Sequence, residues 1–560
     1  LNAVSDRLEG DERLRVARLN LEAGRHARRS AAFPLALDCF SAGVSLLPAD
    51  VWTDDYPLAL ALHGGAAESA YLSARWSQLA DHVVALKANG RTMLDQLVGW
   101  EAQIDGHIAR LEYAPAVGAA LEALQLLNVH LPSDPGDAEI GAELQAAMAA
   151  LARVGPEGLM ALPLADDPAV AAAMRMKTRI GSATYFAKPK LFPVLACRQI
   201  VMSVERGLSH ATPYALSVYG IVLNTIGLHR EAHTWGQAAL RLIDRFEDRS
   251  LEPRTLHVIH DLVCNWVVPL AGTLEDIRRV IDVGRASGEI EYAAYAAHAY
   301  THNAFYVGRD LEQLLVEAQE FTLFIRHHQQ KNALHIHEPW ERLLHCFTGR
   351  APDAARLNGG GFDEETALAA ARETGSRSAQ CMVRLVMGIV RFHFGSMSEA
   401  SEVFEAARPY LDGIASAWHI PMFHQYAALA IHALPAERRE ALRPQAEASL
   451  AELRTLAAAC PENFAHRVAL VEAAGAAHEG RFDAASTRLE EAIRGAEVGR
   501  WCSDLAMAHE LAATIAARRV ERADAGERAS LTEAVARHAA QARAAYATWG
   551  VSGKRAAYAA

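Results

Sequence analysis

The sequence predicts an all-α fold in which antiparallel helix pairs stack into a superhelix. Apolar residues recur at helical spacing along the chain, and small residues recur where two helices must approach closely. No segment of useful length alternates between apolar and polar residues with the period of a strand. The chain has 560 residues, of which 51% are hydrophobic and 22% charged, so it has ample material for a core. That length suits either two or three conventional domains or one long solenoid.

The clearest helix pattern lies at 460–513. Pro461 suits the first position of a helix, and Glu462 adds a favourable negative charge there. Gly480 is placed to end this helix in a left-handed conformation. We therefore expect helix, turn, helix, turn, helix. The inner face of the second helix carries Phe482, Ala485, Leu489, Ala492 and Ile493.

The same pattern begins near the N-terminus, where we expect a helix over 11–29 and a partner helix from Phe33. Small, small, aromatic and proline residues follow one another here at spacings of 12, 4 and 8, which is the tetratricopeptide pattern. Those residues are Gly24, Ala36, Phe40 and Pro48. Because one helix pair cannot bury its own apolar face, neighbouring pairs must stack. Further second helices are expected to open at Trp76, Tyr113, His229, Met397 and Phe482.

Four clusters of Gly, Pro and Asp interrupt the helical pattern and predict loops, at 131–136, 155–168, 187–193 and 350–365. The last cluster contains three consecutive glycines. We predict that 351–365 joins an N-terminal half of the solenoid, 1–350, to a C-terminal half, 366–560.

Charge and composition exclude several classes of protein. The net charge of −12 argues against binding to nucleic acid or to anionic membranes. No uncharged apolar run approaches 18 residues, so no membrane span is expected. Seven cysteines without a CxxC pair suit a reducing cytoplasm. The chain begins with Leu1 instead of Met, and we expect it to be part of a longer protein.

Motifs for phosphate binding and catalysis are absent. There is no GxxxxGK[ST], GxGxxG or GxSxG motif and no kinase catalytic loop. The three glycines at 359–361 precede acidic residues, which repel phosphate. We therefore predict that this chain is not an enzyme and holds no catalytic, cofactor-binding or metal-binding residues.

Histidines nevertheless suggest two alternatives. His337 and Glu338 begin like a zinc-protease helix, but Glu341 stands where the second histidine must be, and Pro339 interrupts the motif. A metal-dependent enzyme using the His-rich segment at 335–345 is therefore the weakest hypothesis. Separately, His298 and His302 are four residues apart on an expected helix and so are able to reach one metal ion; a structural or groove-lining role is the favoured interpretation.

Aromatic and histidine residues gather in two further stretches. If they lie on the inner helices of a solenoid, they form a candidate groove for a ligand or protein partner, with core packing as the alternative. The candidate groove residues are Trp266, Tyr292, Tyr295, His298, His302, Trp340, Trp418 and His419.

Several stretches resemble one family, the helical repeat region of large bacterial and fungal signalling proteins. They are ARLNLEAGRHARRS at 17–30, LQLLNVHLPSDP at 124–135, NGGGFDEE at 358–365, CPENFAHR at 460–467 and AAYATWGVSGKRA at 544–556. Those proteins combine a serine/threonine kinase-like domain, a STAND-type P-loop ATPase, this repeat region and an output module, often a GAF domain with a sensor histidine kinase.

The resemblance implies a regulatory arm. Its partners would be the ATPase and output domains of the same protein, together with an inducer that is a protein or a small molecule. ATP and Mg²⁺ would belong to the adjoining domain, and the end at Trp549-Gly550, followed by Lys554-Arg555, would lead to the output module. An independent scaffold for protein–protein interaction is the alternative, although its usual peptide-carboxylate clamp needs lysines, which are scarce here.

Overall fold

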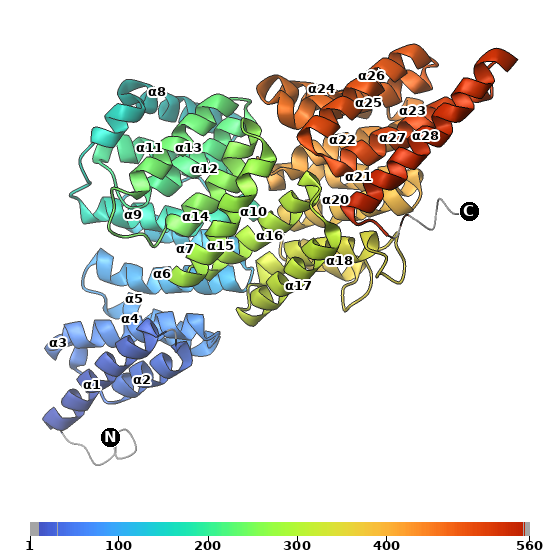
Figure 1. Ribbon diagram of the computed structural model, residues 1–560. Coiled ribbons are helices and arrows are strands. Elements are labelled where there is room, and N and C mark those ends of the chain that lie inside the picture. The colour runs from blue at the N-terminus through green and yellow to red at the C-terminus, as the bar shows by residue number, and fades with distance from the viewer. Residues whose placement is uncertain (1–9, 31, 553, 555–560) are drawn as a thin grey trace. The chain divides into compact units, whose positions relative to one another are not determined.

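The structure is a computed structural model that describes residues 10–30, 32–552 and 554. It confirms the all-α prediction, since the described residues form antiparallel helix pairs (Figure 1). Pairing of the strand type is limited, within the described residues, to two isolated bridges, Leu164–Leu208 and Gly359–Phe362. The chain divides into two compact units, Leu1–Ala215 and Leu216–Ala560.

In the first unit most helices from α1 to α7 pack mainly on their neighbours in sequence, as expected of stacked pairs, whereas α8 packs mainly on α11. Asp167 caps one of these helices by accepting a hydrogen bond from the backbone N–H of Ala169 at 2.9 Å. The helices are α1 (Gly10–Arg29), α2 (Phe33–Ser45), α3 (Val51–Asp54), α4 (Tyr56–Leu72), α5 (Trp76–Asn89), α6 (Met93–Ala109), α7 (Tyr113–Leu126), α8 (Asp137–Ala161), α9 (Pro168–Arg179), α10 (Gly181–Ala187) and α11 (Leu191–Arg206), and α12 (Thr212–Thr225) spans the division.

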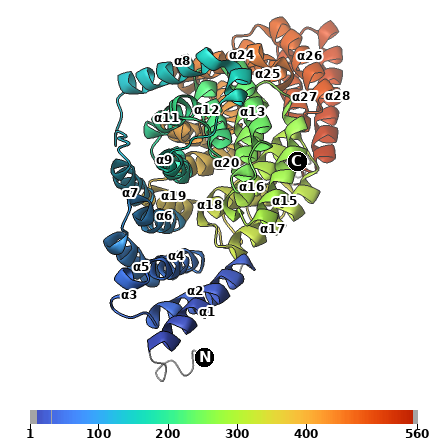
Figure 2. The same ribbon diagram turned by 90° about the vertical axis from the view of Figure 1, so that its left-hand side faces the viewer.

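The second unit is also built of packed helix pairs, and α25 to α28 lie side by side (Figure 2). Its elements are α13 (His229–Ile243), α14 (Glu252–His257), η2 (Val258–Val263), η3 (Cys264–Trp266), η4 (Leu270–Thr273), α15 (Leu274–Ser287), α16 (Ile290–Val307), α17 (Leu311–His327), α18 (Lys331–Phe347), α19 (Glu364–Glu373), α20 (Arg377–Phe394), α21 (Met397–Ala407), η5 (Arg408–Ile414), α22 (His419–His432), α23 (Ala436–Ala441), α24 (Arg443–Ala459), α25 (Pro461–His478), α26 (Phe482–Gly499), α27 (Cys502–Val520) and α28 (Ala525–Trp549).

The predicted second-helix openings are confirmed. Helices α2, α5, α7, α13, α21 and α26 begin at the residues that the sequence pattern indicated. Pro461 occupies the first position of α25, and Gly480 after it has a left-handed φ of 76°. Turn chemistry and helix periodicity therefore located these boundaries without tertiary information.

The pattern of small and aromatic residues also marks a close approach of two helices, as predicted. Phe40 is 1% exposed, and a Cβ on Gly24 would lie 2.5 Å from its ring. Helices α1 and α2 thus approach so closely that only glycine fits opposite Phe40.

Two predicted breaks are partly helical in the structure. Helix α8 continues through the predicted loop at 155–168 as far as Ala161, with a kink at Gly155, whose φ is 63°. Pro339, which was expected to interrupt a helix, lies inside α18. Burial of Trp340 and its neighbours offsets the cost of a proline in a helix, about 3 kcal/mol.

The predicted joint at 351–365 is a loop, but it lies inside the second unit. Arg342 donates through Nε to the carbonyl of Leu357 at 3.0 Å. The backbone N–H of Leu357 donates to Glu364, whose carboxylate pairs with buried Arg391 at 2.7 Å. These buried contacts fasten the glycine-rich loop to helices on both sides of it, and the compact units divide at 215/216. That 351–365 joins two halves of a solenoid stays a prediction.

Contacts between segments far apart in sequence close the second unit. Trp266 donates through Nε1 to the carbonyl of Ser416 at 3.0 Å, and Asn463 donates to the carbonyl of Asn265 at 2.9 Å. Helix α16 is buried at every position from 292 to 306. A helix buried on all sides belongs to a core, so the inner helices of this unit meet one another in its interior.

The CPENFAHR stretch has a structural role in this core. Arg467, 1% exposed, donates to Gln425 at 2.7 Å and pairs with Asp504 at 3.0 Å. His466 contacts the same carboxylate at 3.0 Å. The motif therefore ties α25 to α22 and α27 through a buried polar network.

No helix in the described parts of the chain is long and apolar enough to cross a membrane.

Candidate functional site

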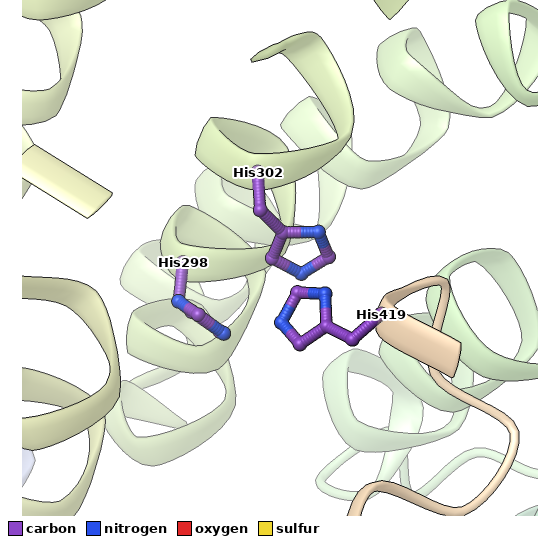
Figure 3. Close-up of side chains that lie close together, drawn as sticks. All are labelled: His298, His302 and His419. Carbon is purple, nitrogen blue, oxygen red and sulfur yellow. The ribbon is translucent and has the colours of Figure 1, made fainter. Parts of the chain in front are cut away.

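Three histidines meet in the interior of the second unit (Figure 3). His298 and His302 project from one face of α16, one turn apart, because residues four apart lie above one another on a helix. His419 is the first residue of α22. Ring centroids are 4.7 Å apart for His298–His302, 4.2 Å for His302–His419 and 5.9 Å for His298–His419. We call these residues the three-histidine cluster.

The cluster is buried and short of hydrogen-bond partners. Its side chains are 4%, 2% and 0% exposed for His298, His302 and His419. Both ring nitrogens of His298, both of His419 and Nδ1 of His302 have no hydrogen-bond partner among the described residues. Buried polar atoms normally have a partner, so this group of unpartnered nitrogens requires an explanation.

The imidazoles are held neutral. Burial, reinforced by the neighbouring imidazoles, keeps the pKa values of His298 and His302 well below the usual range. Burial lowers the pKa of His419 to about 3. Neutral imidazole nitrogens with free lone pairs are available as acceptors or as metal ligands.

One carboxylate stands beside the cluster. Asp261 lies on the π-helical turn η2, a rare conformation that often marks functional sites. Its Oδ1 is 3.9 Å from Nε2 of His302 and accepts a hydrogen bond from Asn303 at 2.9 Å. Burial raises the pKa of Asp261 to about 7, and the hydrogen bond from Asn303 opposes that rise.

Aromatic rings enclose the cluster. Trp340 from α18 stacks on His419 with centroids 5.4 Å apart and lies 5.8 Å from His302. Tyr306 contacts the rings of both His302 and His419, at 6.2 Å and 6.1 Å. These walls exclude solvent and lower the local dielectric constant.

A pinned turn positions His419. Ser416 has a left-handed φ of 63°, and its hydroxyl donates to the carbonyl of Leu262, one residue after Asp261. Asn224 donates to the same hydroxyl at 2.9 Å. The turn that carries His419 is thus fixed to the segment that carries the carboxylate.

The structure brings only some of the predicted groove residues together. Trp340 contacts the three-histidine cluster, whereas Trp418 stacks on Phe464 with centroids 5.0 Å apart. Trp266 stacks on His229 at 5.3 Å. Tyr292 and Tyr295 pack around His257, and Tyr295 also receives a hydrogen bond from Asn332.

All eight predicted groove residues are buried, so they form an interior and not an exposed groove wall. The physical reason is that large aromatic side chains on inner helices fill the space between successive turns of the repeat. Whether any of them contributes to ligand recognition stays a prediction.

The His-rich segment does not converge on one point. His327 and His328 are exposed at the end of α17, while His337 on α18 contacts the carbonyl of Ala318 at 3.1 Å. His345 pairs with Glu341 at 3.6 Å. Among the residues that the structure describes, the three-histidine cluster is the group placed to hold a metal ion.

Sequence reasoning missed Asp261 and Asn303. Asp261 is the single acidic residue in the largely apolar stretch 256–270. That position could have indicated a buried carboxylate with a partner, because acidic residues are almost never buried unpaired. The π-helical turn that aims Asp261 at the cluster has no comparable signature in the sequence.

Comparison with known proteins does not identify the function of the chain. No family model matches the chain, and no curated protein matches it. Among solved structures, the chain is similar to a Rap protein crystallised in complex with competence and sporulation factor, with a TM-score of 0.41 and 12% identity over 65% of this chain and 99% of that one. A likeness at this level assigns no function.

Proposed function

We propose that this chain is a non-catalytic regulatory module of a multidomain signalling protein. It binds a protein partner or a small inducer and transmits that binding to an adjoining P-loop ATPase and an output domain. ATP and Mg²⁺ belong to the ATPase, and the module itself works in the cytoplasm. A helical-repeat fold suits this role, because stacked pairs present extended binding surfaces.

The observation that carries the proposal is how the residues after α28 are held. The backbone N–H of Ser552 donates to the carbonyl of Phe347 at 3.0 Å, at the end of α18. Lys554 pairs with Glu510 of α27 at 2.6 Å and donates to Tyr546 at 3.0 Å. The segment that would lead to an output domain is therefore packed on inner helices, so a change in their packing would reach it.

The chemistry of the interior supports a non-catalytic role. Among the described residues, no Ser, Cys or Lys side chain is hydrogen-bonded to the five unpartnered ring nitrogens of the three-histidine cluster, and nucleophilic catalysis would need such a contact. Coupling of about 1–3 kcal/mol between two sites is enough to change an affinity about five- to 150-fold, and a binding module needs no more.

The test is ATP hydrolysis by the natural protein, with and without residues 1–560. We expect the rate to change when this segment is removed. Lys554→Gln, which weakens the anchor to Glu510, should also change the rate, while Lys331→Gln at an exposed position should not. Circular dichroism checks that both variants keep their helices.

A rate indifferent to both the deletion and Lys554→Gln would overturn the regulatory proposal. The same holds if the natural protein contains no ATPase. Either result would favour an independent scaffold for protein–protein interaction, which is the alternative that a helical-repeat fold also supports.

A further inference from the structure

The three-histidine cluster has the donor set of a transition-metal site. One ring nitrogen from each of His298, His302 and His419 lies within 4.8 Å of one from each of the others. Zinc–imidazole bonds of about 2.0–2.1 Å place the nitrogens of a tetrahedral site about 3.3 Å apart, so coordination would draw these rings together by no more than about 1.5 Å. Imidazole suits zinc, copper, iron and nickel among the divalent ions.

The unpartnered nitrogens point to a ligand. Five of the six ring nitrogens in the cluster lack a hydrogen-bond partner in the described structure, although all three side chains are buried. His298 and His419, with neither ring nitrogen partnered, differ in this from His466, which contacts Asp504 at 3.0 Å, and from His424, which contacts Ser449 at 3.2 Å. A metal ion would satisfy one lone pair on each ring at once.

The charge and the scaffold also fit a bound cation. Asp261, 3.9 Å from Nε2 of His302, supplies the negative charge that a buried dication needs, either as a fourth ligand or as a hydrogen-bond acceptor that orients His302. The turn through Ser416 is bonded to Leu262, so the elements carrying His419 and Asp261 are locked together before any ion arrives.

We propose that His298, His302 and His419 bind one divalent transition-metal ion, with Zn²⁺ as the expected occupant and Asp261 as its buried counter-charge. The ion fastens α16 to α22, two inner helices separated by more than 100 residues of sequence. The site is independent of the regulatory role proposed above, and it stands or falls by metal binding alone.

The first experiment measures zinc in the purified chain, both as isolated and after refolding from urea with Zn²⁺ present, because a buried site is expected to load during folding. We expect one Zn²⁺ per chain after dialysis and a higher melting temperature than for the metal-free protein. A zinc content no higher than that of His298→Gln, under both loading conditions, would overturn the proposal and leave buried water as the partner of these nitrogens.

Variants identify the ligands. His298→Gln, His302→Gln and His419→Gln should each lose the bound zinc, and Asp261→Asn should weaken binding about 10–100-fold. The matched control is His337→Gln, which changes a buried histidine whose ring lies 6.3 Å from that of His298 and whose Nε2 contacts Ala318. It should keep full zinc content; loss of zinc from this variant, with retention in the other three, contradicts the assignment.

Spectroscopy of the unmodified chain covers the case in which a variant does not fold. Co²⁺ in place of zinc should give visible absorption bands without a thiolate charge-transfer band, and X-ray absorption at the zinc edge should show imidazole scattering. A thiolate signature would place the metal on cysteines and overturn the proposed site.

Discussion

The Cβ position of Gly388 in α20 lies 2.5 Å from Cε1 of Phe404 in α21. Gly24 and Phe40 are the same 16 residues apart and make the same contact in the first unit. Phe404 and Phe40 are buried, at 0% and 1% exposed. The closest approach within these helix pairs therefore depends on a missing side chain opposite an aromatic ring.

Gly388→Ala should destabilise the protein. A methyl group at this position must displace the ring of Phe404, and overpacking of this kind costs about 1–3 kcal/mol. Urea denaturation followed by circular dichroism measures the loss. Combining Gly388→Ala with Phe404→Leu should recover part of it, because the smaller side chain makes room.

Gly118→Ala is the matched control. Gly118 lies in α7, and a Cβ there would meet no atom within 4 Å. Alanine should stabilise this helix by about 0.5–1 kcal/mol. If Gly388→Ala and Gly118→Ala changed the free energy of unfolding equally, Phe404 would not pack against Gly388.

Asp504→Asn should be among the most damaging substitutions in the second unit. It leaves Arg467 charged and buried without its counter-ion, and breaking a buried pair in this way costs about 3–5 kcal/mol. Arg454→Ala, which removes a surface partner of Glu472, should cost about 0–1 kcal/mol. Chemical denaturation of both variants tests the difference, and a small effect of Asp504→Asn would mean that the network is not formed.

Lys177→Met should stabilise the first unit at neutral pH. Burial, with Arg198 adding to it and Glu143 opposing it, lowers the pKa of Lys177 to about 7. Its Nζ lies 3.7 Å from the Sδ of Met202, a weak acceptor. Removing this amine from an apolar site should raise the free energy of unfolding by about 1–3 kcal/mol.

The pH dependence of that effect has a defined sign. Because the folded-state pKa of Lys177 lies below its usual value of 10.5, the unfolded chain binds the extra proton between about pH 7 and 10.5. Stability of the unmodified chain should therefore rise across this range relative to that of Lys177→Met. A gap between the two that stays constant from pH 7 to 10 would contradict the burial of this side chain.

Acid should destabilise the second unit over a pH range that the pKa values of its buried histidines define. Burial lowers the pKa of His424 to about 4, with Arg408 adding to the effect. It also lowers the pKa of His432 to about 4, where Arg439 adds and Glu479 opposes. Unfolded histidine titrates near pH 6.5, so the unfolded chain takes up these protons first.

Stability should accordingly fall as the pH drops from about 6.5 to 4, by up to about 1.4 kcal/mol per unit for each histidine. His424→Gln should make the slope shallower, and His327→Gln at an exposed position should not. Thermal unfolding at pH 7, 6 and 5 measures the slopes. Identical slopes for the unmodified chain and His424→Gln would exclude this contribution.

Local patterns were enough to predict many of the helix boundaries. The openings at Phe33 and Phe482 and the stop at Gly480 follow from turn chemistry and apolar periodicity, which act within a few residues. The predicted joint at 351–365 shows the limit of such patterns. Three glycines indicate a loop, but they do not show that buried Arg342 and Glu364 fasten it.

The sequence by itself determined the fold class, the helix pairs and two imidazoles one turn apart on α16, because each depends on residues close together in the chain. Only the tertiary structure decided that His419 completes a cluster with His302, more than 100 residues earlier, and that Asp261 stands beside them. It also decided that the aromatic residues expected along a groove are buried. The reason is that closure of successive repeats on one another depends on small angles summed over many helix pairs, and no local pattern encodes that sum.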